Sequence, residues 1–222
     1  MKKKYHFNKA IILGGSKGLG ANISQNLKKL SIKEIIICSS KDIDTSKIES
    51  VNAFCKKHSS TDIIILNTGG PPNLKFEDIS NELWIKYFNQ LFLGYVNILK
   101  KIRIRKGGYI FNISTAAIKE PSSNLIISTS IRLAFTSLLK SLTYEFRKKD
   151  VSVISIAPGP FKTNRIKKLV NDLKKFEKNL PLKRIGNPDE IGKFVKYIIS
   201  NRIRYISGST IYFDGTTNNT FI

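Results

Sequence analysis

Ser128 and Arg132 stand four residues apart at the start of an apolar stretch that is typical of a helix, STSIRLAFTSLLKSL. Side chains at positions i and i+4 lie one above the other on a helix face, so a hydroxyl and a guanidinium can share one small site. Two interpretations follow: the pair takes part in catalysis, or the two side chains satisfy each other and the helix start. The spacing alone leaves both open.

A second group with possible chemistry is the glycine-rich stretch LGGSKGLGANI, residues 13–23, which follows an apolar run and opens an amphipathic one. Glycine permits a tight turn and lets backbone N–H groups at a helix N-terminus approach a pyrophosphate. This context favours a dinucleotide-binding loop over a turn without a ligand. The loop residues expected to contact the cofactor are Gly14, Ser16, Lys17, Gly18, Leu19 and Gly20.

The residues after the second apolar run indicate which dinucleotide binds. A site for NAD usually has an acidic residue here for the ribose 2′-OH, whereas the 2′-phosphate of NADP needs a positive or hydroxyl partner. This position reads SSK, so Ser40 and Lys41, together with Lys17, favour NADP(H) over NAD(H). The alternative is that lysines fall here because they are abundant throughout the chain.

Short apolar runs rich in Ile and Val must position these groups, and they alternate with longer amphipathic stretches. This alternation predicts an α/β fold: a Rossmann-type doubly wound parallel sheet of about six strands with helices on both faces, in a single domain over residues 1–222. The expected strands cover residues 9–15, 34–40, 62–70, 108–114, 151–159 and 209–215, and the expected helices cover 18–30, 45–58, 80–102, 128–149 and 189–200.

Nearly the whole chain resembles the short-chain dehydrogenase/reductase family. Besides the glycine loop it has NTGG at 67–70, FNIST at 111–115, APGPFKT at 157–163, PLKRIGNPDEIGKFVKYIIS at 181–200 and ISGSTIYFDG at 206–215. The resemblance implies an NADP(H)-dependent oxidoreductase that acts on a carbonyl or alcohol. It also implies cofactor contacts at Asn67, Gly69, Pro158, Gly159 and Thr163.

The catalytic positions of that family are all changed here. The family uses a Ser, a Tyr-x-x-x-Lys pair and a helix Asn, and alignment of the motifs places Thr115, Ser128, Arg132 and Leu91 at these positions. The pattern resembles a divergent branch with Ser-x-x-x-Arg, so we expect Thr115, Ser128 and Arg132 to be catalytic. An aliphatic hydroxyl is a weak general acid, so the proton must come through Ser128 from water, from Lys119 or from the substrate. The alternative function is a catalytically impaired nucleotide-binding sensor or assembly partner.

The interval between Cys38 and Asp62 is shorter than the family pattern requires. The expected helix at 45–58 already fills it, whereas the family normally fits a helix, a strand and another helix. We therefore predict that the usual edge strand is missing or vestigial. The adenine pocket is then open, with Asp42 as a candidate for a remaining contact.

The formal net charge is +22, from 38 Lys and Arg against 16 Asp and Glu. No nucleic-acid motif accompanies this charge, and the abundance of Lys, Ile and Asn is what an A+T-rich genome produces, so we expect no nucleic-acid partner. No apolar run approaches the length of a membrane span, so we expect no membrane partner and a cytoplasmic location. The two cysteines, Cys38 and Cys55, indicate neither a disulfide framework nor a metal site.

The charged segment 162–184 is expected to be a mostly helical excursion above the carboxyl ends of the strands, where the family has its substrate lid. Its lysines indicate an anionic small-molecule substrate, with a solvated helix face as the equal alternative. The resemblance also implies a homo-oligomer, a dimer or tetramer formed through residues 81–102 and 128–148 and the last strand.

Overall fold

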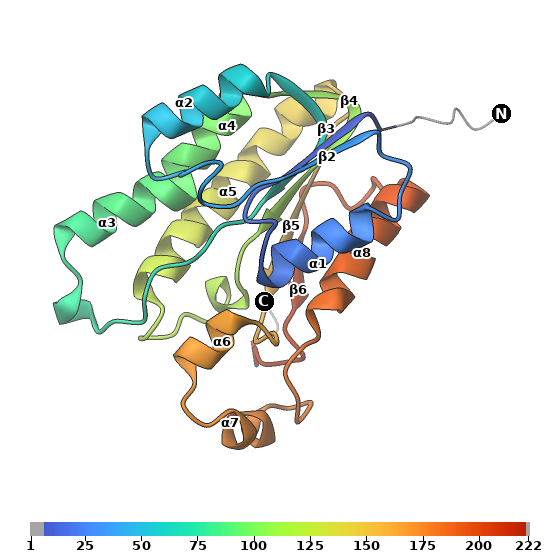
Figure 1. Ribbon diagram of the computed structural model, residues 1–222. Helices are drawn as coiled ribbons and strands as arrows, with labels where there is room; N and C mark the ends of the chain where they lie inside the picture. The colour runs from blue at the N-terminus through green and yellow to red at the C-terminus, as the bar shows by residue number, and fades with distance from the viewer. Residues whose placement is uncertain (1–6, 221–222) are drawn as a thin grey trace.

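The computed structural model describes residues 7–220 and has a parallel six-stranded sheet at its centre (Figure 1). The strand order is β2-β1-β3-β4-β5-β6, and every neighbouring pair is parallel. The predicted doubly wound α/β fold is confirmed. The strands are β1 (Lys9–Ile12), β2 (Glu34–Ile37), β3 (Ser60–Leu66), β4 (Arg103–Ile113), β5 (Ser152–Pro158) and β6 (Thr210–Phe213).

Helices cover both faces of the sheet (Figure 1). One face packs against α1 (Gly18–Leu27) and α8 (Pro188–Asn201), and the other against α2 (Ile48–Lys57), α4 (Gly94–Lys101) and α5 (Ile126–Lys148). The inner strands are buried on both sides, which explains why they read as continuous apolar runs. The chain turns to opposite sides of β1 as it enters β2 and β3, and such a reversal opens a crevice at the carboxyl ends of the strands.

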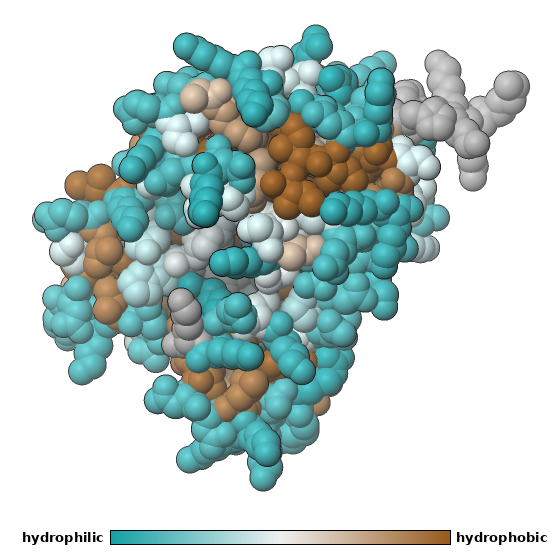
Figure 2. All heavy atoms as spheres, viewed as in Figure 1, coloured by the Kyte–Doolittle hydropathy of each residue, from teal (hydrophilic) through white to brown (hydrophobic). Residues whose placement is uncertain are grey.

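Within the described residues, β2 is the edge of the sheet and no further strand pairs with it. Only α2 lies between β2 and β3, as the short interval predicted. Figure 2 shows an apolar patch at this edge, where Ile35, Ile36 and Ile37 are partly buried. The prediction of a missing edge strand is confirmed for the described part of the chain.

The expected helix at 80–102 differs from the structure. It consists of α3 (Asn81–Phe88), a π-helical turn η2 (Asn89–Leu93) and α4. At Gly94 the helix passes so close to the loop before α2 that an added Cβ would lie 2.2 Å from the main-chain oxygen of Thr45. The π-turn shifts the helical register just before this contact, an effect that local amphipathicity does not reveal.

Two other boundaries bear on the site. The long helix α5 begins at Ile126, so Ser128 lies inside its first turn rather than at its start. The segment 162–184 contains two short helices, α6 (Asn164–Leu169) and α7 (Leu173–Asn179), which lie beyond the carboxyl ends of the strands (Figure 1). Short 3-10 turns η1 (Phe76–Asp78) and η3 (Ala116–Ile118) complete the elements.

Across residues 7–220, none of the helices has the length and apolar character needed to cross a membrane.

Candidate active site

A cavity of about 910 Å³ lies at the carboxyl ends of the strands, between the glycine loop and the α6–α7 segment. Most of the predicted site residues meet here although they come from separate segments. Ser16, Gly20 and Lys41 were also predicted but do not line the cavity. The predicted residues that line it are Gly14, Lys17, Gly18, Leu19, Ser40, Asn67, Gly69, Thr115, Ser128, Arg132, Pro158, Gly159 and Thr163.

The glycine loop has the backbone conformation that its composition predicts. Gly14 and Gly18 both have φ of +56°, a left-handed conformation that favours glycine. Gly20 supports the loop from behind, because a Cβ at this position would lie 2.2 Å from the Gly14 oxygen. Asn67 Nδ2 donates to the same oxygen at 3.1 Å, and Ser24 Oγ donates to the Gly20 oxygen at 2.8 Å. The loop is therefore held in one shape by the segments beneath it.

The N-terminus of α1 opens into this cavity. Lys17 is its N-cap residue, and no side chain accepts a hydrogen bond from the first N–H groups of the helix. The first turn contains no acidic residue. Unpaired N–H groups and the helix dipole favour an anion at such a position, so the loop and helix fit the pyrophosphate of a dinucleotide.

The end of β2 differs from expectation at Asp42. Its carboxylate accepts hydrogen bonds from the backbone N–H and the hydroxyl of Ser39, each at 2.7 Å, and these bonds lower the pKa of Asp42. Asp42 does not line the cavity, whereas Asp44 does and is bonded through its carboxylate to Ser46. Asp44 is thus the acidic residue after β2 that lines the cavity, and the sequence pattern did not distinguish it from Asp42.

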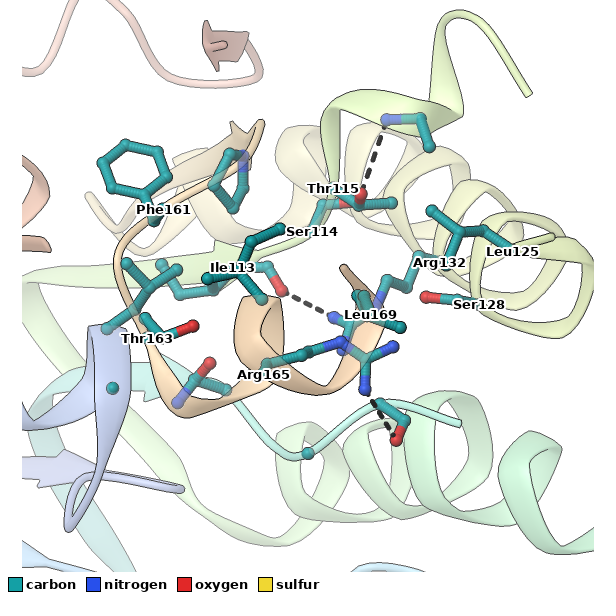
Figure 3. A pocket seen from close by; sticks show the side chains of 18 of the residues that line it. Ile113, Ser114, Thr115, Leu125, Ser128, Arg132, Phe161, Thr163, Arg165 and Leu169 are labelled. Carbon is teal, nitrogen blue, oxygen red and sulfur yellow. Dashed lines mark hydrogen bonds between the residues drawn. The ribbon is translucent and has the colours of Figure 1, made fainter. Parts of the chain in front are cut away.

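Thr115 and Ser128 bring two hydroxyl groups to the middle of the cavity (Figure 3). Thr115 follows β4 and caps η3, where its Oγ1 accepts from the Ala117 N–H at 3.4 Å. The Ser128 side chain is buried, yet its hydroxyl makes no hydrogen bond to any other described residue. Both hydroxyls remain able to donate to a substrate oxygen.

Arg132 does not pair with Ser128, so the interpretation in which the two satisfy each other is wrong. Its Nη1 donates to the main-chain oxygen of Ile113 at 2.8 Å, and its Nη2 lies 3.5 Å from the main-chain oxygen of Thr68. Burial is the largest cause that lowers the pKa of Arg132, and the positive charge of Arg165 lowers it further. A guanidinium nevertheless stays protonated in proteins, so Arg132 is a fixed cation here.

The position that the family fills with asparagine holds a buried apolar side chain. Leu91 lies in η2 and packs with Ile127 and Ile131, away from water. The neighbouring Gln90 lines the cavity instead, and its Nε2 donates to the Gly69 oxygen at 2.7 Å. Gln90 and Leu91 both lie in the π-helical turn, and only Gln90 lines the cavity. No motif in the sequence indicates this turn.

Arg165, in α6, is the second functional candidate that the sequence did not reveal. It lines the cavity and donates to the main-chain oxygens of Gly70 at 3.2 Å and Pro71 at 2.9 Å. The chain has 38 Lys and Arg, and no local sequence pattern distinguishes Arg165 from the others. Lys119, one of the three proton sources that the sequence left open, does not line the cavity and lies over the ring of Tyr212. Within residues 7–220 there is no cluster of His, Cys, Asp and Glu suited to a metal ion.

The sequence and the structure were each compared with those of known proteins. Residues 18–218 match the family model described as "Enoyl-(Acyl carrier protein) reductase". A 3-oxoacyl-(acyl-carrier-protein) reductase of Buchnera aphidicola is 28% identical over 93% of this chain and 95% of the relative. A reductase of the same name from Chlamydia trachomatis is 26% identical over 93% of this chain and 95% of its own.

Solved structures show the same fold at low sequence identity. The L-sorbose reductase of Gluconobacter frateurii, complexed with NADPH and L-sorbose, has a TM-score of 0.83 at 22% identity, and covers 99% of this chain and 100% of its own. A short-chain oxidoreductase of Pseudomonas aeruginosa, NADPH-bound and described as having an atypical catalytic center, has a TM-score of 0.82 at 18% identity, and covers 96% and 97%. At these identities the likeness concerns the fold.

Proposed function

Because the chain belongs to the short-chain dehydrogenase/reductase family and is an oxidoreductase of that type, we propose that it is an NADP(H)-dependent enzyme that acts on a carbonyl or alcohol with atypical proton-transfer residues. The observation that carries this proposal is the single cavity that joins the uncapped N-terminus of α1 to Thr115, Ser128 and Arg132. A nucleotide and a small substrate can therefore lie side by side in it.

Several features support NADP(H) as the cofactor. Ser39, Ser40 and Lys17 line the cavity where the adenosine half is expected, and the Asp42 carboxylate accepts hydrogen bonds from Ser39 and does not line the cavity. A 2′-phosphate would thus meet hydroxyls and a cation, while the Asp44 carboxylate that lines this end is already hydrogen-bonded to Ser46. Both solved structures named above are described as NADPH complexes. When bound, NADPH supplies the hydride.

The chain's own residues would orient the substrate and move the proton. Thr115 and Ser128 can donate hydrogen bonds to the substrate oxygen, where negative charge develops. The Ser128 hydroxyl has no competing partner in residues 7–220, so it can pass a proton to that oxygen and take one from solvent. Arg132 holds a positive charge beside this exchange without giving up a proton. Since a serine hydroxyl is a poorer acid than a tyrosine, the step in which hydride and proton are transferred is expected to be slow and to limit the rate.

The experiment that tests this proposal follows NADPH oxidation by the purified protein with ketones, 3-oxoacyl thioesters and sugar ketones. We expect substrate-dependent oxidation with a primary isotope effect when the transferred hydrogen is deuterium. The proposal fails if a protein that binds NADPH oxidises it no faster with any of these compounds than without them.

A nucleotide-binding sensor or assembly partner without turnover is the second candidate. Two observations favour it: Leu91 is buried in an apolar cluster, and Arg132 hydrogen-bonds main-chain oxygens. This function predicts NADPH binding that is unchanged by Ser128→Ala and is never followed by oxidation. A primary isotope effect excludes it.

We also propose a homo-oligomer, a dimer or tetramer, formed through α3, α4, α5 and the last strand, β6. The exposed apolar side chains on these helices and η2 include Ile85, Phe88, Leu93 and Leu133, and Figure 2 shows apolar side chains on the α3 side of the molecule. Light scattering of the purified protein at 0.15 M salt tests this, and Leu133→Glu is expected to dissociate the assembly.

A further inference from the structure

Two guanidinium groups face one part of the cavity. Arg132 reaches it from α5 and Arg165 from α6, and Figure 3 shows the two side chains converging beside Ser128 and Leu169. They are close enough for the charge of Arg165 to lower the pKa of Arg132. Two like charges therefore share a partly buried site.

All the hydrogen-bond partners of these two side chains are neutral. Arg132 donates to main-chain oxygens of residues 113 and 68, and Arg165 to those of residues 70 and 71. In the described part of the chain neither arginine forms an ion pair. Burial is the largest cause that lowers the pKa of each group, so both charges lose hydration without gaining a counter-charge.

The acidic residues that line the cavity do not neutralise the arginine pair. Asp44 is bonded to Ser46 near the end of β2, and Glu120 accepts from the backbone N–H of Asn219. A nearby carboxylate would raise the pKa of an arginine, and neither Asp44 nor Glu120 is among the groups that shift the pKa of Arg132 or Arg165. The phosphates of a dinucleotide are expected at another wall, at the N-terminus of α1.

A guanidinium carries five N–H donors in a planar fork, and the main-chain contacts leave donors free on both arginines. Such forks match the oxygens of a carboxylate or a phosphate. We propose that the Arg132–Arg165 pair binds an anionic group of the substrate, so that the enzyme acts on a carbonyl compound that carries a carboxylate or phosphate. This inference rests on the proposed function, because it names the substrate class of the same site.

The placement of Ser128 fits this assignment. Its hydroxyl lies beside Arg132 on the same helix face, and Thr115 stands across from it (Figure 3). A substrate anchored by its anionic end at the arginine pair would present its carbonyl oxygen to these hydroxyls. Arg165 also ties α6 to the loop after β3, so the anchor is held by a fixed segment. A purely structural tie is the competing explanation, and it requires no preference for anions.

Binding by the protein loaded with NADP⁺, which cannot reduce the carbonyl probes, tests the proposal in 0.15 M salt by titration calorimetry. The probes are pyruvate, acetoacetate and levulinate with their methyl esters, and dihydroxyacetone phosphate with dihydroxyacetone. We expect at least one anionic probe to bind about tenfold or more tightly than its neutral counterpart, as charge-assisted hydrogen bonds allow. The carboxylate and phosphate arms identify which anion the pair accepts. Equal binding of the charged and neutral members of every pair overturns the proposal.

The variants Arg165→Gln and Lys167→Gln remove the same charge from the same helix. Lys167 is exposed and does not line the cavity, so it serves as the matched control. The anion preference should disappear in Arg165→Gln, persist in Lys167→Gln and be partly retained in Arg165→Lys. If Arg165→Gln and Lys167→Gln lose the anion preference equally, the preference comes from long-range charge, and the proposal is overturned.

NADPH affinity is measured for each variant, and an affinity equal to that of the parent protein shows that the cofactor site is intact. The titration is repeated on cofactor-free protein, so the arginine pair and the cofactor site are judged separately. Absence of NADPH binding contradicts the proposed function, whereas absence of any anion preference contradicts the arginine pair alone.

Discussion

At the cofactor end of the cavity the contacts come from the main chain, whereas at the substrate end they come from side chains on separate elements. The glycine loop offers N–H groups in a shape set by Gly14, Gly18 and Gly20. The substrate end depends on the residue types at Thr115, which caps η3, and in α5 and α6. A main-chain site tolerates few substitutions, because an added Cβ either clashes or strains the backbone, whereas a side-chain site can change its chemistry while the backbone stays in place.

The largest effect is expected from Gly20→Val at the cofactor end. The new side chain would start 2.2 Å from the Gly14 oxygen, so the loop must move. We expect a loss of NADPH affinity of about 100-fold or more, and a free energy of unfolding lower by about 3 kcal/mol or more. Fluorescence titration and urea unfolding measure the two quantities.

Gly69→Ala is the control for this change, since an added Cβ there meets nothing within 4 Å. Its free energy of unfolding should stay within about 0.5 kcal/mol of the parent protein. If Gly20→Val lowered the free energy of unfolding as little as Gly69→Ala, the glycine loop would not need the fixed main-chain conformation described above.

Arg132→Met is expected to affect the substrate end of the cavity much more than the cofactor end. The change removes the donor to the Ile113 oxygen, so the free energy of unfolding should fall by about 1–3 kcal/mol. Turnover should fall about 100-fold, while NADPH affinity falls much less, because the loop and the N-terminus of α1 are untouched. Steady-state kinetics and NADPH titration give the comparison, and Arg132→Lys should restore part of the activity. An equal loss of NADPH affinity and turnover would contradict the separation.

Ser128→Ala should affect chemistry with little effect on stability. Its hydroxyl has no hydrogen-bond partner in residues 7–220, so the free energy of unfolding should change by less than about 1 kcal/mol. If the hydroxyl transfers the proton, kcat should fall by about 100-fold. The exposed Ser130, two residues along the same helix, is the control, and Ser130→Ala should leave kcat unchanged. Equal kcat values for the two variants would remove Ser128 from the mechanism.

The smallest effect concerns Cys38, whose main-chain oxygen accepts from the Gly15 N–H beneath the glycine loop. Burial raises the pKa of its thiol from 9.0 to about 12. Because the folded pKa is the higher one, the thiol stays neutral in the folded protein, and its contribution to stability is full below pH 9 and lost as the pH rises towards 12. In a Cys55→Ser background, iodoacetamide at pH 8.5 should label Cys38 far more slowly than in urea, and NADPH should slow it further. Labelling as fast as in urea would show that the loop region is open.

The two ends also differ in how much the sequence predicted. Strand periodicity and the glycine spacing identified the sheet, the missing edge strand and the loop, because each depends on local residues. Arg165 and Gln90 escaped prediction: one reaches the cavity from a distant segment, and the other faces it through a π-turn. Asp44 and Asp42 were indistinguishable until the hydrogen bonds of Ser39 were known. Side-chain direction and long-range contact are properties of the folded chain that local patterns do not encode.

A fluorescence titration with NADPH and NADH at 0.15 M salt shows whether the glycine loop and α1 bind a cofactor, since salt suppresses nonspecific attraction to a protein of net charge +22. We expect saturable micromolar binding of NADPH, about tenfold or more tighter than that of NADH, and its loss in Gly20→Val. Absence of saturable binding of either nucleotide would contradict it, because the loop, the N-terminus of α1 and the cavity would then have no cofactor to position.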